Sequence, residues 1–169
     1  MGALVSEGHM QKVLSYIDLA KQEGGTVVTG GRRITLPGRC ERGFFIEPTV
    51  ITGLSQECRT NQEEIFGPVV SVMKCRSVEE AIEIGNGVEY GLSAAIYTQD
   101  INRAFAAMRD LYTGIFYINA PTIGAEVHLP FGGTKNTGNG HREAGVAAQR
   151  SELREIERRV LWLATRMID

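Results

Sequence analysis

Runs of β-branched and apolar residues alternate with amphipathic helical stretches along this chain of 169 residues. Runs with strand character lie at residues 26–29, 44–50, 69–73, 94–97 and 115–118. Helical stretches begin after Ser6, Ser77 and Asp100, which are residue types that cap helix N-termini. Alternation of strands with helices is typical of crossover connections. The sequence therefore predicts an α/β fold with a mainly parallel sheet flanked by helices.

The helical stretches carry specific start and stop signals. In the first, apolar residues recur at helical spacing until Gly24-Gly25, which predicts its end. Those apolar residues are Met10, Val13, Leu14, Ile17 and Ala20. Ser77 and Glu80 have the spacing of a capping box, and the helix that they start is expected to end near Asn86. The pattern of the third helix places Ile101, Ala104, Phe105 and Met108 on one face.

The charge balance is close to neutral, with 18 basic and 20 acidic residues and a net charge of −2. This argues against broad capture of nucleic acid or of an anionic membrane. No apolar run approaches the roughly 20 residues that span a bilayer, and the N-terminus does not resemble a secretory signal. The spacing of Cys40, Cys58 and Cys75 predicts free thiols in a reducing, cytoplasmic setting. The histidines lack metal-ligand spacing, so no metal site is predicted.

The segment Gln62-Glu-Glu-Ile-Phe-Gly-Pro-Val69 is unusual for a loop. Its Gly-Pro pair predicts a turn before the following strand. In one interpretation, one carboxylate points into a cleft, where it accepts two hydrogen bonds from a ribose diol, and Phe66 offers a flat face to a ring. A solvated acidic turn is the alternative interpretation.

A second glycine-rich segment runs from Leu129 through Phe131 and Lys135 to Gly145. It lacks the glycine pattern of a dinucleotide fingerprint, and the chain has no Walker A motif. Phe131 is interpreted either as a pocket wall or as an ordinary core residue.

These motifs together resemble the C-terminal part of the catalytic domain of the NAD(P)-dependent aldehyde dehydrogenase superfamily. The matching stretches are Gln62–Val69, Asn86–Ala94, Gly114–Asn119 and Pro130–Gly145, and the helical segment 2–25 also resembles the family. The resemblance covers roughly residues 2 to 150 in the family's order and spacing. It implies a partial catalytic domain at 1–149 and a separate tail at 150–169.

The resemblance assigns roles to residues at matching positions. Glu64 is implied to bind the ribose next to nicotinamide, Phe66 to pack beside the nicotinamide, and Leu92 to lie near it. The substrate-anchoring loop falls at 121–129, which implies pocket roles for Ile123 and Gly124. Phe131 matches an aromatic residue of the aldehyde tunnel. The family uses NAD or NADP.

The family's catalytic groups have no counterpart at matching positions of this sequence. In the family, the nucleophilic cysteine, the general-base glutamate, the oxyanion-stabilising asparagine and the cofactor domain all precede the helix that matches residues 2–25. The three cysteines of this chain fall elsewhere, and proximity to a motif does not activate a thiol. We therefore predict no catalytic residue, no measurable NAD affinity and no aldehyde turnover for this chain alone.

The tail departs from the family, in which the last segment is a strand that joins a neighbouring subunit. Here apolar residues recur every three or four positions with Arg and Glu between them, which favours an amphipathic helix. A strand obscured by charges is the alternative. Either form suits an oligomerisation element that associates with a second copy or with a full-length relative.

Three functions follow from these patterns. The first is a fragment or truncated homologue of an aldehyde dehydrogenase. The complete family enzyme oxidises an aldehyde to a carboxylic acid through a thioester. The second is a non-enzymatic oligomerisation or interaction module derived from that family. The third is a weak esterase that uses one of the three thiols or a pocket surface.

Overall fold

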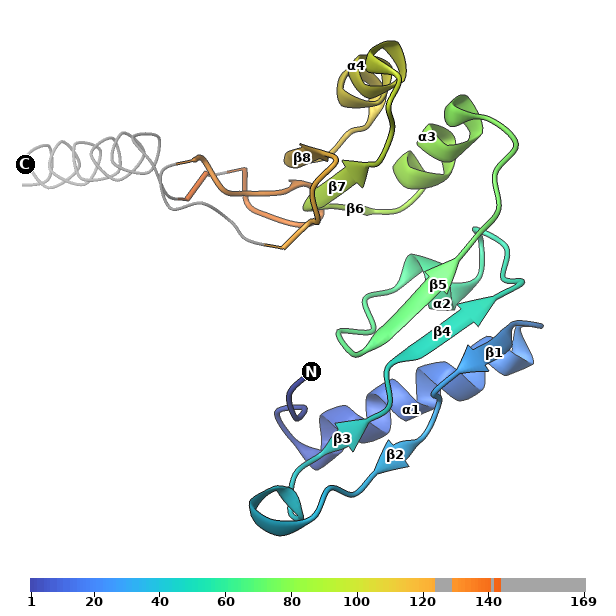
Figure 1. Ribbon diagram of the computed structural model, residues 1–169, viewed down its shortest axis with the longest axis vertical. Coiled ribbons are helices and arrows are strands. Elements are labelled where there is room, and N and C mark those ends of the chain that lie inside the picture. The colour runs from blue at the N-terminus through green and yellow to red at the C-terminus, as the bar shows by residue number, and fades with distance from the viewer. Residues whose placement is uncertain (124–128, 141, 144–169) are drawn as a thin grey trace, which may run out of the picture. The chain divides into compact units, whose positions relative to one another are not determined.

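A computed structural model describes residues 1–123, 129–140 and 142–143. The chain divides into two compact units, Met1–Arg76 and a second that begins at Ser77, and each is described by itself (Figure 1). Gly124 and the tail at 150–169 lie outside the described residues. The division of the chain at residue 149 and the helix or strand expected beyond it therefore stay predictions.

In the first unit, a helix covers one face of a small sheet (Figure 1). Its elements are α1 (Glu7–Gln22), β1 (Thr26–Thr29), β2 (Arg33–Ile34), η1 (Gly38–Cys40), β3 (Phe45–Ile46), β4 (Thr49–Thr52), α2 (Arg59–Gln62) and β5 (Val69–Val72). The sheet has the order β1-β4-β5, and β2 pairs with β3. From α1, Met10, Val13 and Ile17 pack with Ile46, and Ala20 packs with Ile51 and Leu54. These residues form the core of the unit.

Helix α1 begins and ends as the sequence predicts. The Ser6 hydroxyl accepts a hydrogen bond from a backbone amide of the first turn. At the other end, the Gly24 amide donates to Lys21 O over 3.1 Å and the Gly25 amide donates to Ala20 O over 2.8 Å. Gly24 has a φ of 90°, a left-handed conformation that favours glycine. These bonds satisfy carbonyls of the last turn, as glycine-terminated helix ends commonly do.

The sheet is mixed, so the prediction of a mainly parallel sheet is wrong for the described residues. Strands β4 and β5 are parallel, but β1 pairs antiparallel with β4 and β2 antiparallel with β3. The antiparallel pairing continues from Thr29–Val50 to Arg33–Ile46. Strands β1 and β2 therefore form one arm of a long hairpin, and β3 and β4 form the other. A hairpin closed near η1 connects β1 to β4, and a hairpin makes its strands antiparallel.

The single strand predicted at 44–50 is divided into β3 and β4. Pro48 lies between them and has no N–H to donate to a neighbouring strand. The Thr49 amide instead donates to Pro68 O over 2.8 Å, which aligns β4 with β5. The interruption therefore marks where the hairpin passes into the parallel part of the sheet.

The second unit contains another pair of parallel strands. Its elements are α3 (Val78–Asn86), β6 (Tyr90–Gly91), β7 (Ser93–Ile96), α4 (Ile101–Asp110), β8 (Ile115–Ile118) and β9 (Thr134–Lys135). Helix α4 connects the parallel strands β7 and β8, while β6 pairs antiparallel with β9. The Asn86 side chain joins the ends of the two helices, since it donates to Asp110 O and accepts from the Tyr112 amide, each over 2.8 Å.

Helix α4 buries a different arc from the face that the apolar pattern indicates. Ala104 and Ala107 are buried, whereas Ile101, Phe105 and Met108 are exposed. Ala104 and Ala107 lie on the side of α4 next to that of the larger residues. Their small side chains allow neighbouring backbone to approach the helix closely.

Among the described residues, no helix has the length and apolar character needed to cross a membrane.

Candidate functional site

The loop between α2 and β5 lies along helix α1. The Lys12 ammonium donates to Glu64 O over 2.9 Å, and His9 Nε2 lies 2.7 Å from Phe66 O. At Gly67 a Cβ atom would come within 2.6 Å of a Val13 methyl, so the backbone fits against the helix only without a side chain there. The loop is thus held by its main chain.

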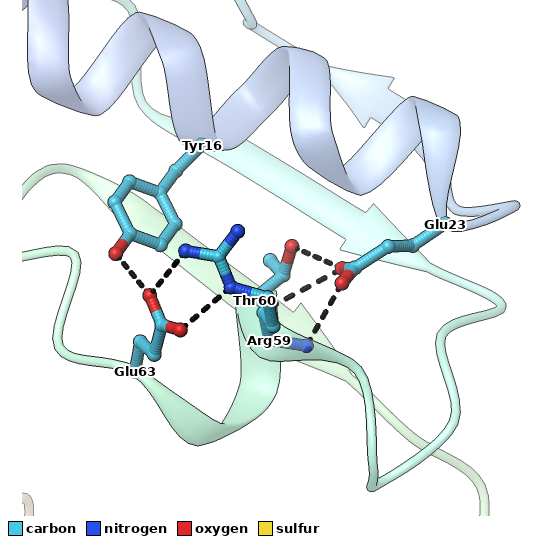
Figure 2. A network of polar contacts seen from close by, with 5 residues as sticks. All are labelled: Tyr16, Glu23, Arg59, Thr60 and Glu63. Carbon is cyan, nitrogen blue, oxygen red and sulfur yellow. Dashed lines mark hydrogen bonds and ion pairs between the residues drawn. The ribbon is translucent and has the colours of Figure 1, made fainter.

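A polar network anchors the start of this loop (Figure 2). Arg59 binds the Glu63 carboxylate with two nitrogens, at 2.7 and 3.0 Å, and the Tyr16 hydroxyl donates to the same carboxylate. Beside this, the Glu23 carboxylate at the end of α1 accepts from the Arg59 amide at 2.8 Å and from the Thr60 hydroxyl at 2.6 Å. The network therefore ties α2 to the second half of α1 at two places.

The network sets the ionisation of its carboxylates. Hydrogen bonds from Arg59 and then Tyr16 lower the pKa of Glu63 to about 2. The same contact raises the pKa of Tyr16, chiefly because its hydroxyl donates to Glu63. At Glu23, burial raises the pKa, but hydrogen bonds from Thr60 and Arg59 outweigh it, so the net shift is downward.

This arrangement predicts a specific acid sensitivity for Glu63. Its folded-state pKa of about 2 lies below its ordinary value of 4.5, so ionised Glu63 stabilises the fold above about pH 4.5 and loses this effect as the pH falls toward about 2. Thermal unfolding by circular dichroism should show that Glu63→Gln lowers the midpoint near neutral pH and that this difference shrinks with acid. Tyr16→Phe, which removes one donor, should be intermediate. Equal pH slopes for Glu63→Gln and the unchanged chain would contradict the assignment.

Glu64 and Phe66 present their side chains differently from Glu63. Both side chains are exposed, and Phe66 is 74% accessible. Phe66 also has a φ of 56°, in the left-handed region that non-glycine residues rarely occupy. Of the two adjacent carboxylates, Glu63 is bound within the fold, and the exposed Glu64 carboxylate is the one accessible to hydrogen bonds from a ligand.

The remaining candidate residues belong to the second unit. Leu92 is exposed between β6 and β7, and Ile123 is exposed in the segment after β8. Phe131 is half-buried, and its amide and carbonyl pair with those of Glu143 over 2.6 Å. Gly124 lies outside the described residues. The structure thus brings Glu64 and Phe66 together on one loop, and it describes Leu92, Ile123 and Phe131 separately.

The glycine-rich segment of the second unit is anchored by three side chains to which the sequence assigned no role. Lys135 Nζ donates to Asn86 O at 2.8 Å and to Val88 O at 3.0 Å, at the end of α3, where a cation complements the helix dipole. The Thr137 hydroxyl accepts from the Gly91 amide over 2.7 Å. Arg142 donates to the carbonyls of Gly132 and Gly133. These bonds fix the backbone around Phe131.

Residues His9, Lys12, Tyr16 and Arg59 were also missed as parts of the site. The three on α1 recur at steps of three and four, which is the spacing of one helix face. That signal exists in the sequence, but an exposed polar face is usually solvated, and only the position of the loop gives it a partner.

The cysteines show no organised chemistry among the described residues. All three are free thiols, as predicted: Cys40 and Cys58 are half-buried and Cys75 is exposed. Cys58 Sγ lies 3.6 Å from the Ser55 hydroxyl, a neutral group that is not a general base. Within the described part of the chain, no three His, Cys, Asp or Glu residues are grouped as metal ligands.

Comparison with known proteins gives one consistent family. The aldehyde dehydrogenase family profile matches residues 1–155. The alpha-ketoglutaric semialdehyde dehydrogenase of Bacillus subtilis is 38% identical over 149 residues, which are 88% of this chain and 30% of the relative. The betaine aldehyde dehydrogenase of Mesorhizobium japonicum is 43% identical over 148 residues, again 88% of this chain and 30% of the relative. The chain therefore spans about 30% of the length of these relatives.

Solved structures agree with this result. A double mutant of betaine aldehyde dehydrogenase from Staphylococcus aureus, in complex with NAD+, superimposes with a TM-score of 0.83 at 38% identity, over 89% of this chain and 30% of that one. An aldehyde dehydrogenase from Bacillus cereus gives a TM-score of 0.80 at 40% identity, over 88% and 29% of the two chains. The described α/β units are thus similar to part of a larger enzyme fold.

Proposed function

Since this chain belongs to the aldehyde dehydrogenase family, we propose that it supplies the nicotinamide-ribose contact and one wall of the aldehyde pocket of an NAD(P)-dependent aldehyde dehydrogenase. In this proposal it corresponds to the C-terminal part of the catalytic domain, and activity belongs to the complete enzyme. The order of the motifs from Gln62–Val69 to Pro130–Gly145 supports that placement.

The observation that carries the proposal is the loop at Glu64 and Phe66. The Lys12 and His9 side chains of α1 contact the Glu64 and Phe66 carbonyls of this loop. The Glu64 carboxylate and the Phe66 ring are exposed to solvent. A carboxylate can accept both hydroxyl protons of a ribose diol. An adjacent aromatic face suits a planar ring. The residues present therefore fit the nicotinamide half of the cofactor, which when bound accepts hydride from the substrate.

The chain's own residues have limited roles in this proposal. Glu64 orients the ribose, and Phe66 limits the position of the nicotinamide ring. For Leu92 in the second unit, the role near the nicotinamide rests on the family resemblance alone. Ile123, Gly124 and Phe131 line the aldehyde side. Pyrophosphate binding in dinucleotide sites depends on a helix N-terminus and a glycine loop, and Glu64 and Phe66 offer neither. We accordingly expect no measurable affinity of this chain alone for NAD or NADP.

A chimeric enzyme tests the proposal. The chain alone should form no NADH or NADPH from a panel of aldehydes and should give no calorimetric binding at micromolar dinucleotide. A chimera in which it replaces the matching 30% of M. japonicum betaine aldehyde dehydrogenase should regain turnover. Within that chimera, Glu64→Gln should weaken dinucleotide binding roughly 10- to 100-fold, the scale of lost charge-assisted hydrogen bonds.

The exposed Glu41 provides the matched control, because its replacement also removes one carboxylate from the first unit. Glu41→Gln should leave dinucleotide affinity unchanged in the chimera. Aldehyde turnover by the chain alone would contradict the proposal that activity belongs to the complete enzyme. Equal dinucleotide affinities of the Glu64→Gln and Glu41→Gln chimeras would contradict the role of Glu64.

A further inference from the structure

The backbone at Phe66 is held in a conformation that it does not adopt readily by itself. Its φ of 56° lies in the left-handed region, where the Cβ of a non-glycine residue is crowded. Such residues persist only when the surrounding structure fixes them, and they concentrate at functional sites. A group in the surrounding structure must therefore fix Phe66.

His9 is the side chain that contacts Phe66 in two ways. Its Nε2 lies 2.7 Å from Phe66 O, and its ring meets the Phe66 ring edge-on, with centroids 6.1 Å apart and an interplanar angle of 70°. The His9 backbone is itself fixed, because its amide donates to the Ser6 cap over 3.1 Å. The imidazole thus reaches the loop from a rigid helix end.

The contacts on either side limit the alternatives open to the loop. Lys12 holds Glu64 O one turn further along α1, and Val13 leaves Gly67 no room for a side chain. Between the held Glu64 carbonyl and the held Gly67 backbone, a fixed Phe66 carbonyl limits the φ and ψ that Phe66 can adopt. These angles set the direction of the Phe66 Cα–Cβ bond.

We propose that His9 is a positioning residue, which holds Phe66 in the left-handed conformation and thereby sets the outward direction of the Phe66 ring. The proposal deepens the function proposed above, on which it rests, because it names the residue that positions the proposed ring contact at Phe66. Preformed sites avoid part of the ordering cost of binding. His9 does not need to touch the ligand for this role.

Nuclear magnetic resonance of the whole chain without dinucleotide tests the proposal. The nuclear Overhauser effect between a residue's own amide and Hα hydrogens is strong when φ is positive, since the two hydrogens then approach closely. In the unchanged chain it should be strong at Phe66. His9→Leu, which removes the donor at similar size, should reduce it to the level of residues with negative φ. His9→Gln, which keeps a terminal N–H donor, should retain it.

The same spectra contain internal controls. Asn119 and Lys135 have φ values of 54° and 53° in the second unit, so their signals should stay strong in every variant. A strong Phe66 signal in His9→Leu would overturn the proposal, and so would its loss in His9→Gln. If His9→Leu fails to fold, Phe66→Gly combined with it should restore folding, because glycine occupies this region freely; failure of that rescue also counts against the proposal.

These measurements separate the proposal from the function on which it rests. They involve neither dinucleotide nor aldehyde, so a negative result leaves the Glu64 chimera experiment unaffected. Conversely, a chimera that binds dinucleotide equally well with and without the Glu64→Gln substitution would contradict the proposed function and would not alter the Phe66 signal. The role of His9 and the proposed function can therefore be contradicted independently of each other.

Discussion

Replacing Ile17 with alanine should be among the most destabilising single changes in the first unit. Ile17 is 1% exposed and packs with Met10, Val13 and Ile46 between α1 and the hairpin. Removing its branched side chain loses buried apolar contact and leaves a cavity, which costs about 2–5 kcal/mol in well-packed cores. Urea unfolding followed by circular dichroism should show this as a lower midpoint.

Gln11→Ala is the matched control for Ile17→Ala, because Gln11 is exposed on the same helix. Exposed substitutions of this kind usually change the free energy of unfolding by less than about 0.5 kcal/mol. A loss below about 1 kcal/mol for Ile17→Ala would mean that the core of this unit can relax around the missing atoms.

The helices could be predicted from sequence because their signals are local. Ser6, Ser77 and Asp100 each accept a hydrogen bond from a backbone amide two or three residues further on. Such a cap needs no distant partner, so a few consecutive residues are enough to predict it. The ends of α1 and α3 near Gly24 and Asn86 follow for the same reason.

The short strands could not be predicted because distant residues define them. Tyr90 pairs with Lys135, and Gly91 pairs with Thr134, across a long stretch of chain. Neither two-residue run has a period that distinguishes it from a loop. The prediction of strand direction was wrong for another reason. Alternation of strands and helices predicts crossover connections and parallel strands, but the connection from β1 to β4 is a hairpin.

The sequence does not show which of the two adjacent carboxylates, Glu63 or Glu64, is exposed. Chemistry alone suggests that one of two adjacent carboxylates faces a ligand, and it does not say which one. The structure binds Glu63 to Arg59, four residues earlier, and to Tyr16 on α1, so Glu64 is the exposed carboxylate. The choice depends on Tyr16, which only the fold brings close.

Replacing Gly114 with alanine should have the largest effect in the second unit. A Cβ atom there would collide with the Gly132 carbonyl oxygen and approach Arg142 Nη1 to 2.8 Å. The obstacle is backbone, held in place by Arg142 and by the bonds of the neighbouring Thr134, so a side-chain rotation cannot relieve it. Overpacking of this kind costs about 1–3 kcal/mol and occasionally more.

Gly138→Ala separates this collision from a general cost of replacing glycine. Around Gly138 the nearest atoms to a new Cβ lie at 3.8 and 3.9 Å, which is ordinary contact distance. Urea unfolding should therefore place Gly138→Ala within about 0.5 kcal/mol of the unchanged chain, well above Gly114→Ala. Hydrogen exchange should also be faster in Gly114→Ala at the Thr137 amide, which donates to Thr134 O over 3.1 Å. Equal stability of the two variants would show that the segment around Gly132 shifts freely, and the backbone positions argued for Phe131 would then not be fixed by these bonds.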